Sequence, residues 1–265
     1  MKFLAMLLTL GSFSAFANHG GSHWSHQTEA ILNAFTGNTE QLTIGASQAS
    51  TTSFGDGWNF SGTGEYNYGE VNGGTITARN WQLGARLGKS FSEKLEGYYQ
   101  GNLLSDEFQQ IDSRLDNEIG ILYNFINPSI NDAEGNETNN MGKYSFGSTF
   151  FFGKLGYRFT VENFSIDNIT DAAGAVLPEN RNNAVVGLGF GTALTSSLAF
   201  LSEANWVRTL GEDDRNLFDA FAGFRSTLSK SFALKFGYEF AYNDNAPIGV
   251  RDTDGKYIVS VLATY

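Results

Sequence analysis

Three histidines near the start of the chain are the residues whose type and spacing most readily suggest chemistry. His19, His23 and His26 lie in the segment HGGSHWSH and are the only histidines among 265 residues. Imidazoles spaced by four and three residues could bind zinc or copper in a flexible tail. No cysteine or aspartate nearby completes a ligand set. We therefore favour a disordered leader over residues 18–27, and expect no metal and no cofactor.

The placement of the histidines also limits catalysis. Histidine-dependent proteases, phospholipases and acyltransferases need an imidazole as general base, and none occurs from residue 27 to 265. Adjacent carboxylates, Asp106 with Glu107 and the acidic run 212–214, could in principle act as acid and base. Adjacent acidic residues in loops are usually only solvated. We therefore expect a protein that is not an enzyme.

Charged residues of both signs recur at alternate positions through the rest of the chain. Alternation with period 2 places successive side chains on opposite faces of a strand, so these charges share one face. In a closed sheet they could pair across a narrow lumen and block it, or line a thin pore selective by size and charge. The lumen-lining candidates are Glu65, Arg86, Glu96, Glu118, Lys154, Arg158, Glu203, Asp219, Arg225, Lys235 and Glu239.

The strands that position these charges are visible in the sequence. WNFSGTGEYNY places four aromatic residues on one face and polar residues on the other, and NWQLGARLGK repeats the pattern. Apolar-out and polar-in alternation is typical of transmembrane barrels. It predicts an all-β fold, a transmembrane antiparallel up-and-down β-barrel of about 12 strands within a range of about 10 to 14. The strands are expected near residues 28–36, 40–50, 57–70, 76–89, 94–104, 113–126, 143–161, 183–194, 198–209, 216–228, 231–243 and 255–265.

Connection lengths test this topology, because such barrels have short periplasmic turns and longer outer loops. The expected periplasmic turns at 90–93, 195–197 and 229–230 are short. The longest outer loop, residues 162–183, carries an apolar run and is a candidate plug for the lumen. Segment 127–142 would be an unusually long periplasmic connection, and its role stays open.

A soluble β-sandwich or β-solenoid is the alternative fold, because its strands also alternate. Such a fold would place aromatic residues singly in a core. Here the outward aromatic residues lie mostly toward strand ends, as in the aromatic girdles of membrane barrels. They are Trp58, Tyr66, Tyr68, Trp81, Tyr99, Tyr123, Trp206, Tyr238, Tyr242, Tyr257 and Tyr265.

Both ends of the chain point to export. Residues 1–17 carry one charge, a short apolar stretch and a small-x-small ending, which predicts a signal peptide. The leader 18–27 is then expected in the periplasm, and the barrel over 28–265. The last strand ends in an aromatic residue, as bacterial outer-membrane barrels do. Its alternate residues form the expected assembly signal, Tyr257, Val259, Val261, Ala263 and Tyr265.

Overall composition narrows the partners. The formal net charge of −11 argues against nucleic acid. The chain has no cysteine, so it has neither a disulfide framework nor a lipoprotein anchor. The expected location is the cell outer membrane. The expected partners are outer-membrane lipid, lipopolysaccharide and the barrel-assembly machinery, and the oligomeric state stays open.

Three stretches carry a family resemblance. They are AFTGNTEQLTIGASQAS, EYNYGEVNGGTITARNWQLGARLGK followed by LLSDEFQQIDSRLDNEIG, and the closing LKFGYEFAYNDNAPIGVRDTDGKYIVSVLATY. In order and spacing they resemble the salt-induced outer-membrane protein family, also described as domain of unknown function 481. The resemblance covers nearly the whole mature chain and implies an outer-membrane β-barrel without an established reaction or ligand. Segments 127–142 and 167–183 depart from the family pattern.

Two functions follow from these observations. The first is a narrow passive channel for small polar solutes or ions. The second is a non-conducting barrel that acts in envelope integrity or surface contact through its acidic outer loops. Inward glycines remove side-chain volume and would suit a channel, although glycines more often serve sheet curvature and close strand approach. They are Gly84, Gly88, Gly223 and Gly237.

Overall fold

The structure is a computed structural model of the chain. It describes residues 24–36, 41–71, 75–107, 110–126, 149–164, 170, 180–211, 215–244, 246 and 252–265. Several predictions fall outside these residues: the signal peptide, His19 and His23, segment 127–142, the acidic run 212–214 and most of the candidate plug.

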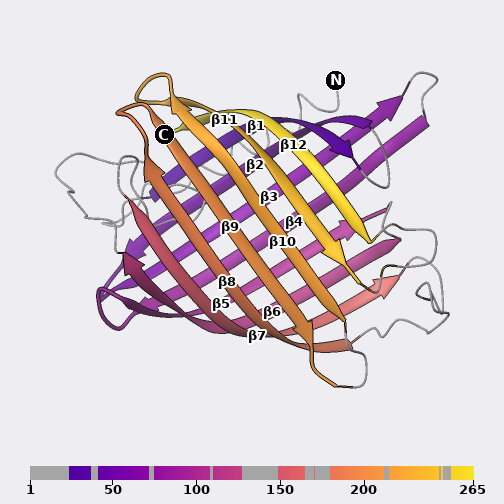
Figure 1. Cartoon of the computed structure of the whole chain (residues 1–265), viewed down its shortest axis with the longest axis horizontal. Coiled ribbons are helices and arrows are strands. Elements are labelled where there is room, and N and C mark those ends of the chain that lie inside the picture. Colours follow the sequence, from indigo (N-terminus) through magenta and orange to yellow (C-terminus); the bar gives the residue numbers. More distant parts are fainter. Residues whose placement is uncertain are drawn as a thin grey trace.

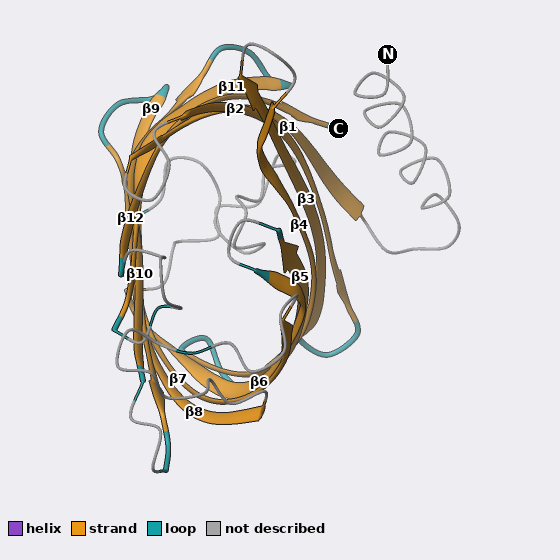
Figure 2. Cartoon of the chain, turned by 90° about the vertical axis from the view of Figure 1, so that its right-hand side faces the viewer, coloured by secondary structure: helices purple, strands orange, loops and turns teal. Residues whose placement is uncertain are grey.

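Twelve antiparallel strands form a closed barrel in the described part of the chain, which confirms the predicted fold. Each strand pairs with its neighbours in sequence, and β12 pairs with β1 to close the ring. Figure 1 shows the strands crossing the barrel obliquely, and Figure 2 shows the ring nearly end-on. The strands are β1 (Trp24–Thr36), β2 (Gln41–Phe54), β3 (Trp58–Val71), β4 (Thr75–Ser90), β5 (Leu95–Asp106), β6 (Ile111–Ile126), β7 (Phe150–Phe164), β8 (Asn180–Ala193), β9 (Leu198–Thr209), β10 (Asn216–Thr227), β11 (Phe232–Asn243) and β12 (Thr253–Thr264).

Period-2 alternation explains why these residues form a barrel wall. In β6 the carboxylate of Glu118 is buried at 1% exposure, whereas its neighbour Ile119 is 61% exposed. The same contrast separates buried Leu122 from exposed Ile121 and Tyr123. Large apolar side chains therefore point outward and charged ones inward, which is the arrangement that lipid outside and a polar interior require.

The connections distinguish the two ends of the barrel. The turns at 55–57, 91–94, 194–197 and 228–231 lie at the end where β12 finishes, which we call the terminal end. The opposite end, where β1 leads into β2, is the loop end. The three short turns predicted from the sequence all lie at the terminal end, as expected. No helix among the described residues is long and apolar enough to cross a membrane.

Two strand boundaries correct the sequence predictions. β1 begins at Trp24, inside the predicted leader, because the closing strand supplies partners there. The backbones of His26 and Tyr265 exchange two hydrogen bonds of 3.0 Å. β7 continues to Phe164 and β8 begins at Asn180, so both ends of the predicted loop 162–183 belong to strands.

Candidate functional site

The charged side chains inside the barrel form ion pairs between strands that are neighbours or next-but-one neighbours in the ring. Three pairs join predicted lumen residues to each other: Arg86 with Glu96 at 2.7 Å, Arg158 with Glu118 at 2.8 Å, and Lys154 with Glu203 at 3.7 Å. Two more pairs join a predicted lumen residue to a residue that was not predicted to line the lumen. Lys235 pairs with Glu29 at 2.9 Å, and Glu239 pairs with Lys256 at 2.5 Å.

The remaining three candidates have other surroundings. Glu65 accepts a hydrogen bond of 2.7 Å from the Asn67 amide. Asp219 accepts one of 2.8 Å from the Asn205 amide. Arg225 is almost fully buried. All three residues occupy inward-facing positions, because successive side chains of a strand point to opposite faces of the barrel wall.

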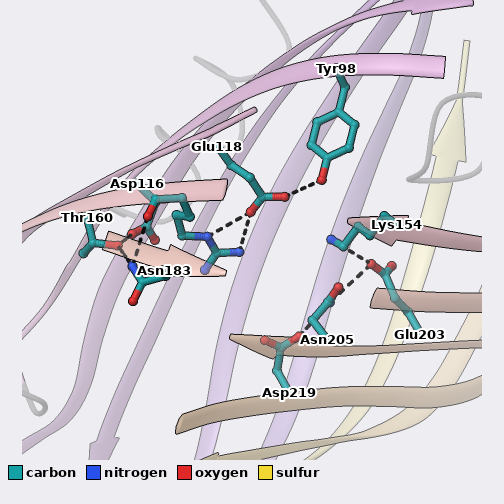
Figure 3. A network of polar contacts seen from close by, with 10 residues as sticks. Tyr98, Asp116, Glu118, Lys154, Thr160, Asn183, Glu203, Asn205 and Asp219 are labelled. Atoms are coloured by element: carbon teal, nitrogen blue, oxygen red, sulfur yellow. Dashed lines mark hydrogen bonds and ion pairs between the residues drawn. The ribbon is translucent and has the colours of Figure 1, made fainter. Parts of the chain in front are cut away.

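One wall of the lumen is a continuous buried polar network (Figure 3). The Tyr98 hydroxyl donates to Glu118 Oε1 at 2.6 Å, and Arg158 Nε donates to Glu118 Oε2 at 2.9 Å. Toward the loop end, the Thr160 hydroxyl donates to Asp116 at 2.5 Å and accepts from the Asn183 amide at 3.1 Å. Because every member has a partner, this network fixes the wall formed by β5 to β8.

The wall formed by β9 to β11 is different, because its acidic side chains are accessible. Asp219 is exposed, and the side chains of Glu203 and Glu239 are 29% and 42% exposed. Asn205 joins Asp219 to Glu203, whose other neighbour is Lys154, so these groups face the interior together (Figure 3). Figure 2 places β10 across the ring from β5. The lumen therefore has a packed wall and an accessible acidic one, which adjoin where β8 pairs with β9.

An apolar cluster inside the packed wall lies toward the terminal end. Tyr98, Leu122, Phe150 and Phe152 are buried against one another, with Leu201 beside them. Facing glycines make room for the rings: a Cβ on Gly189 would lie 2.2 Å from Phe152. The glycines of β8 are a signal for this cluster in the sequence.

The four glycines predicted to face inward lie where atoms of neighbouring residues come close to the backbone. A Cβ added to Gly84 would lie 2.6 Å from the Thr63 hydroxyl oxygen. A Cβ added to Gly88 would lie 2.6 Å from an Asn59 side-chain atom. At Gly223 it would lie 2.6 Å from a backbone carbonyl, and at Gly237 it would lie 2.5 Å from the Phe221 ring. Neighbouring atoms already fill these spaces, so the glycines do not enlarge the lumen.

His26 lies at the terminal end of β1, on its outward face. Its Nδ1 is 2.9 Å from the Ser50 hydroxyl, and its ring stacks against those of Trp24 and Tyr265. The described residues contain no group of three histidine, cysteine or carboxylate side chains that could hold a metal ion. His26 is therefore part of an aromatic cluster at the barrel rim.

The closed barrel, the apolar exterior and the charged interior together define a transmembrane β-barrel of the outer-membrane type. The chain belongs to the family described as "Protein of unknown function, DUF481", whose model matches residues 28–265. The match confirms the predicted membership in domain of unknown function 481.

Solved structures similar to the chain include porins and an autotransporter barrel. NanC porin is similar at 9% identity with a TM-score of 0.54, over 88% of this chain and 98% of that one. The translocator domain of autotransporter NalP from Neisseria meningitidis shares 14% identity with a TM-score of 0.45, over 98% and 94% of the two chains. KdgM porin shares 8% identity with a TM-score of 0.46, over 90% and 99%. No curated protein matches the sequence.

Proposed function

We propose that this protein is a narrow passive channel for small polar solutes or ions in the bacterial outer membrane. In this proposal the terminal end faces the periplasm, lipid and lipopolysaccharide surround the apolar exterior, and the barrel carries no catalytic site. The observation that supports it is the accessible acidic wall of Glu203, Asp219 and Glu239. Glu203 and Glu239 stay 29% and 42% exposed although each has a lysine partner. A barrel filled entirely by its own side chains would bury such carboxylates together with their partners, because isolated burial of a charge is costly.

The exposed carboxylates also determine which ions the proposed channel would prefer. Of the bases on this wall, Lys235 is bound to Glu29 and Arg225 is buried. Lys154 of β7 and Lys256 of β12 are bound to Glu203 and Glu239, whereas Asp219 accepts a hydrogen bond from the Asn205 amide. A fixed negative charge in a narrow passage raises the local concentration of cations. The channel should therefore prefer cations near the middle of the lumen.

Replacement of Asp219 tests this proposal. In planar bilayers with a salt gradient, Asp219→Asn should reduce the cation-to-anion permeability ratio by roughly twofold, because one lumen charge is lost. Glu107→Gln is the matched control, since Glu107 is an exposed carboxylate at the loop end that pairs with outward-facing Arg79. Equal effects of the two changes would place the selectivity at the surface instead of the lumen.

The non-conducting alternative predicts another result. If the barrel acts only through its outer loops, neither Asp219→Asn nor the parent protein should give a measurable reversal potential. The ion pairs across the packed wall are compatible with both functions, so only the accessible acidic wall favours conduction.

A further inference from the structure

One sector of the outer surface departs from the apolar exterior of the barrel. It lies on β1, β2 and β3, which are side by side in the ring (Figure 1). Thr28 of β1 pairs with Gln48 of β2, which pairs with Gly64 of β3, and Ser50 of β2 pairs with Gly62 of β3. These residues alternate along each strand with residues that face the lumen, and all of them are partly exposed on the outside. We call Thr28, Gln48, Ser50, Gly62 and Gly64 the polar sector.

The polar sector lies within the apolar band of the barrel. The outward aromatic residues Trp58 and Tyr68 lie on either side of Gly62 and Gly64 along β3. In barrels of this kind, girdles of aromatic residues flank an apolar band that is about 25 Å tall. The polar sector therefore faces the part of the bilayer that holds hydrocarbon.

Hydrocarbon does not match this surface. On the far side of the ring, β7 and β8 present Leu155 and Leu188 outward near the middle of the strands, and both are exposed. The polar sector has an amide and two hydroxyls in the corresponding place, and lipid tails offer no hydrogen bonds to such groups. Polar side chains inside a membrane usually hydrogen-bond to another protein surface.

The polar side chains satisfy each other only in part. Gln48 Oε1 accepts a hydrogen bond of 2.5 Å from the Thr28 hydroxyl, and Gln48 Nε2 donates one of 3.1 Å to the Ala49 carbonyl. The Ser50 hydroxyl lies 2.9 Å from His26 Nδ1. The second hydrogen of the Gln48 amide makes no hydrogen bond within the part of the chain that the structure describes. An acceptor for it at this depth comes from another protein chain, because lipid tails have none.

The two outward glycines are not explained by packing within the barrel wall. A Cβ added to Gly62 would lie 3.7 Å from its nearest atom, in the Phe60 ring, which is an ordinary contact. A Cβ added to Gly64 would lie 3.3 Å from the flexible end of the Leu83 side chain. At the inward Gly223, by contrast, a backbone carbonyl oxygen lies 2.6 Å from that position. Small residues on an outer surface let a second protein surface approach closely.

We propose that the polar sector is the contact surface between two copies of this barrel in the membrane. A second copy presents the same amide and hydroxyl groups at the same depth, so it supplies both donors and acceptors. In a two-fold arrangement the sector meets itself, and the free amide hydrogen of Gln48 in each copy reaches an oxygen of the other. This contact goes beyond the proposed channel function and does not depend on conduction.

Disulfide cross-linking tests the contact, because the chain has no cysteine of its own. Ser50→Cys places a thiol in the polar sector. Ser202→Cys is the matched control, since Ser202 is a partly exposed outward serine of β9 on the far side of the ring. Refolded full barrels are oxidised in lipid vesicles at a low protein-to-lipid ratio and run on a non-reducing gel. We expect Ser50→Cys to run mostly as a dimer and Ser202→Cys to stay monomeric.

Gln48→Leu tests the hydrogen bonds without a new thiol. Energy transfer between copies labelled on lysine with donor or acceptor dyes gives the dissociation constant of the dimer in vesicles. Gln48→Leu should raise this constant by about 5- to 10-fold, because two symmetry-related hydrogen bonds are lost. Leucine suits a lipid-facing position, so the variant should still show the faster migration of a folded barrel on an unheated gel.

Three results would overturn the contact. Equal cross-linking of Ser50→Cys and Ser202→Cys would indicate random collision. A parent protein without energy transfer, together with an unlinked Ser50→Cys, would show that lipid covers the polar sector. An unchanged dissociation constant in Gln48→Leu would show that the copies meet through another surface.

Discussion

Two consecutive tyrosines in β5 show how strongly the side of the wall determines a residue's role. Tyr98 points inward, is buried, and donates its hydroxyl hydrogen to Glu118. Tyr99 points outward, is 51% exposed, and donates to Asn117 at 2.7 Å. The two hydroxyls make similar bonds, but only the Tyr98 bond satisfies a buried carboxylate.

This difference predicts unequal costs for the same chemical change. Tyr98→Phe should lower the free energy of unfolding by about 1–3 kcal/mol, because it leaves a Glu118 oxygen without that donor. Tyr99→Phe should cost at most about 1 kcal/mol, because its partner stays exposed. Urea unfolding in lipid vesicles, followed by tryptophan fluorescence, measures both. Equal losses would mean that the buried network does not stabilise the wall.

At the residue scale, alternation selected eleven charges for the lumen and left out others that lie inside, Glu29 and Asp116 in mid-strand and Glu162 near a strand end. Glu162 and Arg181 were assigned to a loop, and Lys256 was overlooked although Tyr257 was placed outward. Lys154, Arg158 and Glu162 all fall on the same face of a strand with period 2, so extending the predicted strand would have placed Glu162 inside the barrel. Arg114 of β6 and Arg181 of β8 both form ion pairs with Glu162 of β7. This convergence depends on register between strands, which a single sequence does not reveal.

At the scale of the strand, β8 illustrates how glycine and aromatic residues fit together. Phe150 and Phe152 of β7 lie over Gly191 and Gly189 of β8, where a Cβ would come within 2.3 Å and 2.2 Å of the rings. The rings therefore cannot keep their positions if β8 acquires side chains. Strand pairing and the apolar cluster are consequently coupled.

Gly189→Ala should lower the free energy of unfolding by about 1–3 kcal/mol, since the extra methyl overpacks the cluster. Gly101→Ala is the control, because the nearest atom to its added Cβ is 3.9 Å away. Its stability should stay within about 0.5 kcal/mol of the parent protein. The same urea measurement compares them, and a neutral Gly189→Ala would show that the apolar cluster is loosely packed.

Element boundaries were harder to predict than element number. Alternation located all twelve strands, because lipid outside and charge inside impose the same period on each. The start of β1 was wrong by four residues, since its first residues pair with the other end of the chain. His26 and Tyr265 lie far apart in the sequence, so a local pattern does not predict the contact between them.

At the scale of the whole molecule, closure of the sheet creates an interior with two unlike walls. One wall is held by buried ion pairs and an apolar cluster, and the other presents accessible carboxylates. The sequence predicted charges of both signs in the lumen. It did not separate the paired from the accessible ones, because that depends on which strands face each other across the ring.

Single-channel current of the refolded protein in a planar bilayer shows whether the lumen is open to ions. Folding is checked first by faster migration of the unheated protein on a gel. We expect discrete current steps, carried mainly by cations. A folded barrel that inserts and passes no current would contradict it, and would indicate that the side chains and loops close the lumen.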